Sequence, residues 1–174
     1  MKKLKLGIIG AGRIGKVHTA TLVQSVPSAV VVALADINPD SANELANTFG
    51  IPAVFKNYMD VINHPEVEAI VICSPTDTHA KYIIDSAKAG KHIFCEKPVD
   101  LSLEVIKGAL KAVATAGVKL MVGFNRRFDP NFMKIKQLVA EGKIGDPHIL
   151  KITSRDPAPP PAEYSAVSGG MFMD

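Results

Sequence analysis

A glycine-rich turn directly after a short apolar run is the feature that most constrains how this chain can fold. Residues 6–9 form the apolar run, and Gly10, Gly12 and Gly15 follow in G-x-G-x-x-G spacing. Helix-compatible sequence begins inside the turn, where Ile14 is the first apolar residue of one helix face. The pattern predicts a strand, a tight turn and a helix in immediate succession.

A second apolar run with an acidic end completes this unit. Residues 30–35 are apolar, and Asp36 follows them, 21 positions after Gly15. In a dinucleotide-binding unit the first glycine permits the tight turn, the second lets the backbone approach the pyrophosphate, and the third lets helix and strand pack closely. Free N–H groups at the helix start meet the phosphate charge, and the acid can accept hydrogen bonds from the ribose hydroxyls. The whole unit predicts dinucleotide binding far more specifically than the glycines alone.

The same acid bears on which dinucleotide binds. A carboxylate would repel a 2′-phosphate, and the next residues, Ile37, Asn38 and Pro39, include no arginine. The sequence therefore favours NAD over NADP. Arg13, inside the glycine turn, argues mildly the other way, although a place beside the pyrophosphate or in solvent is the simpler interpretation.

The chain continues to alternate between strand-like and helix-like segments. Further strands are expected at residues 53–55, 69–73, 92–95 and 119–123. The run at 69–73 is continuously apolar, as in a parallel strand that is covered on both faces. This β-α repetition predicts an α/β fold with a Rossmann-type, doubly wound, largely parallel sheet.

Helices are expected between these strands. Asn38 and Pro39 are a typical helix start, and a short helix is expected at residues 57–63. Thr76 or Asp77 can cap the next helix. The helix after the fifth strand is expected to turn four apolar residues inward, namely Leu103, Ile106, Leu110 and Val113.

Composition bounds the class of protein. The chain has 174 residues, 47% hydrophobic and 21% charged, which is enough for one domain and part of another. A net charge of +3, with the signs mixed along the chain, gives little support to nucleic acid or a membrane surface as partner. Apolar runs are shorter than a membrane span, and Met1 leads almost directly into the first strand, so a cytoplasmic protein is expected. Cys73 and Cys95 are expected to be reduced and buried, and the histidines form no metal-binding pattern.

The alternation stops after the sixth expected strand. We predict an NAD-binding domain over residues 1–123 and the beginning of an incomplete α+β second domain over residues 124–174. Asp129-Pro130 should open a helix, and residues 147–154 alternate as a single strand. The Pro-, Ala-, Ser- and Gly-rich remainder is expected to be a long loop.

Candidate site residues follow from where ligands bind in such a sheet. Ligands lie beyond the carboxyl ends of the strands, so the polar residues directly after each strand are the candidates. They are Ser74, Pro75, Thr76 and His79 after the fourth strand, Glu96, Lys97 and Pro98 after the fifth, Asn125, Arg126 and Arg127 after the sixth, and Asp156 after the last.

Lys97 is the strongest single candidate for catalysis. A lysine close to a cationic nicotinamide ring and an arginine would have a destabilised ammonium group, which favours proton exchange at neutral pH. A solvated lysine in a turn is the alternative, and Pro98 can be cis or trans. Arg127 could bind a substrate oxygen or pair with an acid. His18 and His92 are interpreted as packing or surface histidines.

These segments together resemble the Gfo/Idh/MocA oxidoreductases. The resemblance covers the whole chain and rests on GIIGAGRIG at 7–15, Ser74-Pro75-Thr76 with His79, Glu96-Lys97-Pro98, GFNRRFDP at 123–130, SRDPAPPP at 154–161 and SGGMFMD at 168–174. The glycine motif is shared by many families, whereas the Glu-Lys-Pro segment is much more specific. The last two segments point to the members that act on cyclic polyols.

The resemblance implies NAD-dependent oxidation of a polyol ring hydroxyl to a ketone, with myo-inositol favoured. Lys97 would be catalytic, and Asp174 would match the aspartate of a D-x-x-x-H motif that orients the substrate and a proton-transferring histidine. The implied cofactor-binding residues are Gly10, Gly12, Arg13, Ile14, Asp36, Ser74, Pro75, Thr76, His79, Glu96 and Lys97. The implied substrate residues are Lys97, Arg127, Asp156 and Asp174, and no metal is implied.

The chain departs from the family pattern at its end. The sequence stops at Asp174, so the histidine of the motif and most of the second domain are absent. We therefore expect a fragment of a longer, homo-oligomeric enzyme or a truncated gene product, inactive or nearly so by itself. The alternatives are a dehydrogenase for another sugar, an amino-sugar derivative or a dihydrodiol, and a non-catalytic NAD-binding module such as a redox sensor or a remnant.

Overall fold

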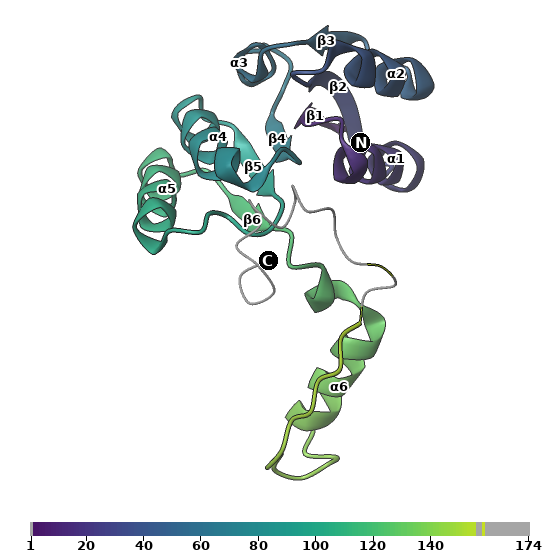
Figure 1. Cartoon of the computed structure of the whole chain (residues 1–174), viewed down its shortest axis with the longest axis vertical. Helices are drawn as coiled ribbons and strands as arrows, with labels where there is room; N and C mark the ends of the chain where they lie inside the picture. Colours follow the sequence, from purple (N-terminus) through teal and green to yellow (C-terminus); the bar gives the residue numbers. More distant parts are fainter. Residues whose placement is uncertain (1, 156–157, 159–174) are drawn as a thin grey trace.

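The computed structural model describes residues 2–155 and 158. In this part of the chain six strands form one parallel sheet in the order β3-β2-β1-β4-β5-β6 (Figure 1). The strands are β1 (Leu4–Ile9), β2 (Ala29–Ala35), β3 (Ala53–Phe55), β4 (Ala69–Ile72), β5 (His92–Cys95) and β6 (Leu120–Val122). The helices are α1 (Arg13–Ser25), α2 (Pro39–Phe49), α3 (Tyr58–Ile62), α4 (Thr76–Lys88), α5 (Leu103–Ala116), the 3-10 helix η1 (Asn125–Phe128) and α6 (Pro130–Ala140). The predicted doubly wound α/β fold is confirmed.

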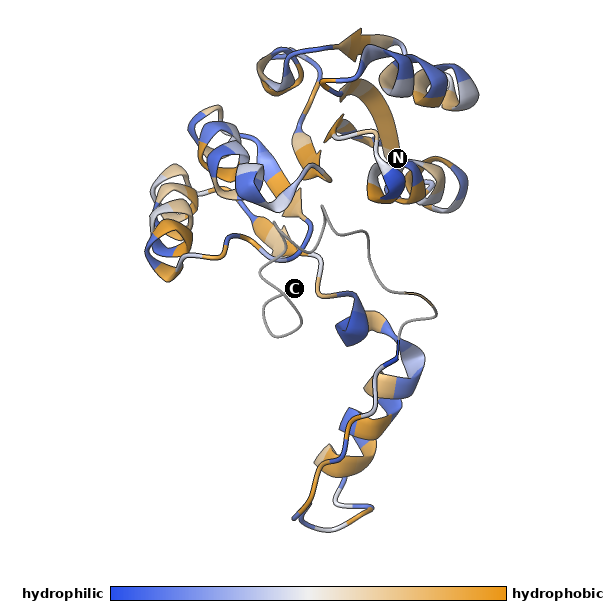
Figure 2. Ribbon diagram, in the orientation of Figure 1, coloured by the Kyte–Doolittle hydropathy of each residue, from blue (hydrophilic) through white to orange (hydrophobic). Residues whose placement is uncertain are grey.

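Helices cover both faces of the sheet. Figure 1 shows α1 and α2 on one side and α3, α4 and α5 on the other. Two clusters of buried side chains lie between these layers. One contains Leu45 of α2, and the other contains Ile62 of α3, Ile83 of α4 and Val113 of α5. The strands are mostly hydrophobic (Figure 2), with Lys5 in β1 and His92 at the start of β5 as exceptions, as expected where both faces of a parallel sheet are covered.

The register of the sheet brings the carboxyl ends of neighbouring strands together. Ile9 at the end of β1 is aligned with Ala35 of β2 and with Ile72 of β4. Ile72 is aligned with Cys95, and Cys95 with Val122, at the ends of β5 and β6. The residues that follow five different strands therefore meet along one edge of the sheet.

Local signals account for the boundaries of α2. Its N-cap is Asn38, whose side chain accepts a hydrogen bond from the backbone N–H of Asp40 at 3.1 Å, and Pro39 is the first helical residue. Gly50 ends the helix in the left-handed conformation, with φ of 67°, which costs glycine little because it has no Cβ.

The start of α4 differs from the prediction. Its N-cap is Pro75, and neither Thr76 nor Asp77 caps it through a side chain. Instead the Thr78 hydroxyl donates a hydrogen bond to the carbonyl oxygen of Pro75 at 2.6 Å. The Thr78 hydroxyl oxygen also lies 2.6 Å from the hydroxyl oxygen of Ser74. The helix begins one residue earlier than a Thr76 cap would require, because Pro75 already has the extended conformation of an N-cap.

The buried face of α5 agrees with the prediction only in part, since Val113 is buried and Ile106 is half-buried as expected. Leu103 and Leu110 are 64% and 48% exposed, whereas Ala109 and Val113 are buried. The α5 helix packs against α4, and Ala109 is fully buried. The two larger leucines lie largely in solvent.

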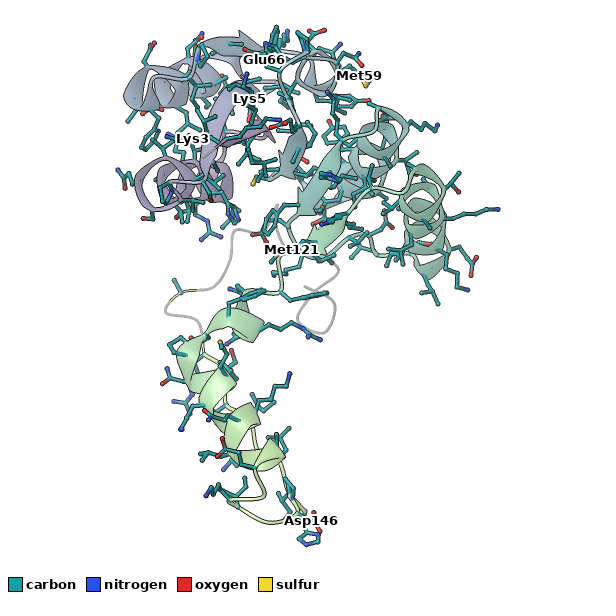
Figure 3. The ribbon with its side chains drawn as sticks, turned by 180° about the vertical axis from the view of Figure 1, so that it is seen from behind. Lys3, Lys5, Met59, Glu66, Met121 and Asp146 are labelled. Carbon is teal, nitrogen blue, oxygen red and sulfur yellow. The ribbon has the colours of Figure 1, made fainter. Side chains whose placement is uncertain are left out.

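The chain beyond β6 leaves the sheet. Met121 of β6 lies close to the point of departure and Asp146 at the far end of the projecting arm (Figure 3). The α6 helix begins as predicted, because the Asp129 side chain accepts from the N–H groups of Asn131 and Phe132 at 2.8 and 3.3 Å. However, α6 has no buried residue.

The expected strand at residues 147–154 is absent from the described structure. These residues have no strand assignment, and Ile149, Leu150 and Ile152 are 89%, 80% and 71% exposed. A strand requires a hydrogen-bonding partner, and no described segment supplies one. Apart from residue 158, the long loop expected from residue 156 onward lies outside the described residues.

Cys73 and Cys95 are free and buried, as predicted. They belong to different buried clusters. Burial, assisted by the nearby Glu96 carboxylate, raises the pKa of the Cys73 thiol to about 12.

Among the described residues, no helix combines the length and the apolar character that a membrane crossing needs.

Candidate cofactor and catalytic site

The glycine turn has the geometry that its spacing predicts. Gly10 has φ of +104°, and a Cβ there would lie 2.6 Å from the carbonyl oxygen of Cys73. A Cβ on Gly15 would lie only 1.9 Å from the carbonyl oxygen of Gly10, so the start of α1 packs directly on the turn. A Cβ on Gly12 would meet nothing within 4 Å. Gly10 and Gly15 are therefore required by the fold, and the backbone at Gly12 is open to a ligand.

The beginning of α1 is suited to an anion. Gly12 is its N-cap, no side chain caps the helix, and its first turn contains no acidic residue. The unpaired N–H groups and the positive end of the helix dipole therefore remain available for a phosphate group. Arg13 is exposed beside this position and Ile14 is half-buried.

Asp36 is held beside the turn by backbone hydrogen bonds. One carboxylate oxygen accepts from the N–H of Ala11 at 2.6 Å, and the other accepts from the N–H of Asn38 at 2.8 Å. Each oxygen retains capacity to accept a further hydrogen bond. The structure thus brings the acid at the end of β2 to the glycine turn, where ribose hydroxyls could reach it.

His79 joins the loops that follow β4 and β5. Its Nε2 lies 2.8 Å from the carbonyl oxygen of Ser74, and its Nδ1 lies 2.7 Å from that of Pro98. The residue is 2% exposed, which leaves almost no surface for the expected direct contact with a cofactor. The geometry gives His79 an indirect role, because it fixes two loops relative to each other.

Glu96 and Lys97 follow β5 at the same edge, and the Lys97–Pro98 peptide bond is cis. One carboxylate oxygen of Glu96 lies 2.6 Å from His18 Nε2, and the other accepts from the backbone N–H of Lys97 at 3.2 Å. Burial by itself would raise the pKa of Glu96. The hydrogen bonds from His18 and from the Lys97 amide, together with the positive charges nearby, outweigh burial and hold this pKa below its ordinary value.

A cavity of about 500 Å³ lies beside this segment. It is lined by Lys97, Phe124, Asn125, Arg126 and Arg127. Lys97 and Arg127 therefore line the same cavity. The Arg126 guanidinium lies 5.5 Å from the centre of the Phe132 ring, within the range of a cation–π interaction.

Two of the predicted site residues, Asp156 and Asp174, lie outside the described residues. Sequence reasoning missed Thr78 and Gly123, and it interpreted His18 as a packing or surface histidine. No short-range signal connects His18 to Glu96, because 78 positions separate them. Within residues 2–155, no group of three or more His, Cys, Asp or Glu side chains could hold a metal ion.

The sheet order, the glycine turn and the acid at the end of β2 define a dinucleotide-binding domain of the Rossmann type. Residues 4–124 match the Gfo/Idh/MocA family model, described as "Oxidoreductase family, NAD-binding Rossmann fold". The chain belongs to this family, and the predicted cofactor, NAD, is confirmed.

Relatives match the chain over nearly its whole length. It is 50% identical to the uncharacterized oxidoreductase YrbE of Bacillus subtilis, over 99% of this chain and 50% of that protein. It is 44% identical to myo-inositol 2-dehydrogenase of Thermotoga maritima, over 98% of this chain and 51% of that protein. The chain thus spans about half the length of the curated relatives it matches.

A solved structure agrees with these matches. Scyllo-inositol dehydrogenase from Lactobacillus casei, with bound NAD(H) and scyllo-inositol, superimposes with a TM-score of 0.80 at 36% identity. This likeness covers 83% of the chain and 43% of the L. casei chain.

Proposed function

We propose that this chain is the NAD-binding, lysine-bearing part of a dehydrogenase for cyclic polyols. The reaction would oxidise a ring hydroxyl, with myo-inositol favoured as substrate, to a ketone. The observation that carries the proposal is the position of Lys97. It follows β5 at the edge of the sheet that also holds the glycine turn and Asp36, and it lines a cavity with Arg127. The inositol dehydrogenases among the relatives support the choice of substrate.

Each part of the site would hold a different part of the reactants. The N–H groups at Gly12 and the start of α1, with Arg13 and Ile14 alongside, would bind the pyrophosphate, and Asp36 would bind the adenosine ribose. Ser74, Pro75 and Thr76, together with Glu96 and Lys97, would flank the nicotinamide end. The bound nicotinamide ring supplies the hydride acceptor.

Lys97 would manage the proton of the substrate hydroxyl. A lysine that exchanges a proton with the reacting oxygen acts in the transition state as a general base or acid. Arg127, in the wall of the same cavity, would bind a substrate oxygen. Asp156 and Asp174 are proposed substrate residues from the family resemblance, with Asp174 orienting the substrate.

The 174-residue chain by itself is proposed to be inactive or nearly so. The support for this proposal is the coverage of the relatives, because the chain spans only about half the length of the dehydrogenases that it matches. We also propose that a protein of the relatives' full length is a cytoplasmic homo-oligomer. Two alternatives remain. One is a dehydrogenase for another sugar or a dihydrodiol, and the other is a non-catalytic NAD-binding module.

Two measurements test the proposal. Titration calorimetry on the chain should show NAD binding, because all the proposed cofactor contacts precede residue 100. NAD reduction should then be followed in a protein of the relatives' length that begins with this chain, with myo-inositol, scyllo-inositol, other sugars and a dihydrodiol as substrates. Oxidation of inositols supports the proposal, and preference for another substrate supports the first alternative. NAD binding without turnover on any of them favours the non-catalytic module.

A further inference from the structure

The Glu96 carboxylate is a meeting point for elements that are distant in the sequence. Its Oε1 lies 2.6 Å from Nε2 of His18 on α1, and its Oε2 accepts the backbone N–H of Lys97 at 3.2 Å. The side chains of His18 and Glu96 are 27% and 20% exposed. Because both are largely shielded from water, the interaction between them is screened less than an exposed ion pair would be.

Neighbouring residues confine this pair. The His18 ring packs edge-on against Phe94 of β5, with ring centres 5.1 Å apart and planes inclined by 64°. On the other side, a Cβ at Gly123 would lie 3.1 Å from both Glu96 Oε1 and Phe94 Cζ. The end of β6 therefore leaves just enough room for the carboxylate, and α1, β5 and β6 together fix its position.

We propose that His18 is a positioning residue for Lys97. By holding one oxygen of Glu96, His18 keeps the other oxygen in place to accept the Lys97 N–H, and so fixes the backbone from which the Lys97 side chain extends. The α1 helix also begins at the glycine turn, so the pair joins the phosphate-binding helix to the loop that carries the lysine. The importance of this link for turnover rests on the proposed function, whereas the link itself does not.

The electrostatic surroundings favour an ionised Glu96. The groups that face it are His18 from α1, the Lys97 charge from its own loop, and the thiols of Cys73 and Cys95. Burial raises the pKa of both thiols, so they are neutral at neutral pH. Since the pKa of Glu96 is lowered on folding, its link to Lys97 is complete above the ordinary glutamate pKa. It is lost as the pH falls through the lower folded value.

Amide NMR of the chain tests the proposal directly. The ¹H and ¹⁵N shifts of the Lys97 amide, followed from about pH 7 to about pH 3, report the protonation of Glu96. In His18→Ala the midpoint of this transition should rise, and hydrogen exchange at the Lys97 amide should accelerate about tenfold or more. His18→Gln retains a neutral N–H donor for Glu96. It should therefore return the exchange rate of the Lys97 amide closer to that of the unmodified chain than the midpoint of the Glu96 transition. His148→Ala, which removes an exposed imidazole far from Glu96 in sequence, is the control and should change neither.

Unchanged midpoint and exchange rate in His18→Ala would overturn the proposal. If that variant does not fold, the Glu96 ¹³Cδ resonance of the unmodified chain decides. A midpoint below the ordinary glutamate value supports the link, and a midpoint at or above it refutes the link. These readouts require no turnover, so an absence of polyol oxidation in the longer protein would count against the proposed function alone.

Discussion

Alanine at Gly15 should mainly affect the stability of the fold, and alanine at Gly12 should mainly affect the binding of NAD, although the two glycines belong to one motif. At Gly15 the new Cβ would lie 1.9 Å from the carbonyl oxygen of Gly10 and 2.8 Å from its carbonyl carbon. At Gly12 it would meet no atom within 4 Å. We therefore expect Gly15→Ala to destabilise the fold. We expect Gly12→Ala to retain the fold and lose affinity for NAD.

The loss of stability expected in Gly15→Ala follows from the overlap of the new Cβ with the Gly10 carbonyl group. Cβ contacts below 3.0 Å are essentially never seen, so α1 must move away from the turn by about 1 Å. Overpacking typically costs about 1–3 kcal/mol. The obstacle here is backbone, which cannot rotate out of the way, so we expect about 3 kcal/mol or more. That is a large part of the ~5–15 kcal/mol stability of a typical domain.

The Gly12→Ala substitution should cost little stability. Gly12 has φ of −69° and ψ of −169°, which alanine also adopts. Because glycine is a better N-cap than alanine, the loss should stay within about 1 kcal/mol. The added methyl group would occupy the space through which the pyrophosphate approaches the backbone. NAD affinity should therefore fall by about tenfold or more, which corresponds to about 1.4 kcal/mol.

Urea unfolding followed by far-ultraviolet circular dichroism, and NAD titration calorimetry, measure the two effects. Gly108→Ala is the matched control, because Gly108 lies inside α5 with nothing within 4 Å of its added Cβ. It should stabilise the chain by about 0.5–1 kcal/mol. If Gly15→Ala unfolds at the same urea concentration as the unmodified chain, the steric reasoning is wrong. Unchanged NAD affinity in Gly12→Ala would show that the pyrophosphate does not approach the backbone there.

Three other predictions concern cofactor choice, catalysis and the end of the described structure. Asp36→Ala should weaken NAD binding and relax discrimination against NADP, and an unchanged ratio of the two affinities in calorimetry would show that the acid does not touch the ribose. In a protein of the relatives' length, Lys97→Ala should lower turnover by about 100-fold or more while NAD affinity stays within a few-fold. Near-normal turnover of this variant on inositol would show that Lys97 is a turn residue without a catalytic role. Backbone amides at residues 147–155 should exchange rapidly at low protein concentration, whereas those of β1 and β4 are protected. Strong, concentration-independent protection of residues 147–155 would contradict the inference that this segment lacks a partner.

The features that the sequence by itself determined depend on short-range rules. The βα alternation follows from the periodicity of apolar residues, and the turn between β1 and α1 follows from the spacing of its glycines. Asn38 and Asp129 mark helix starts because an N-cap side chain bonds to N–H groups two or three residues away. Asp36 bonds Ala11 across 25 positions, but it could still be assigned to the glycine turn because the βαβ unit is nearly the same in every fold of this type. The division at residue 123 and the role of Lys97 stay predictions.

Only the tertiary structure decided the features that depend on contacts between distant segments. The inward face of α5 depends on its packing against α4, where Ala109 is buried, so Leu103 and Leu110 could not be placed from periodicity alone. Residues 147–154 have a strand-like pattern, but no segment within residues 2–155 pairs with them. A strand exists only when another segment completes its hydrogen bonds. His79 and His18 acquire their roles from carbonyl and carboxylate oxygens that the sheet register brings to them. A residue type reveals which hydrogen bonds a side chain can make, and the fold decides which partner is within reach.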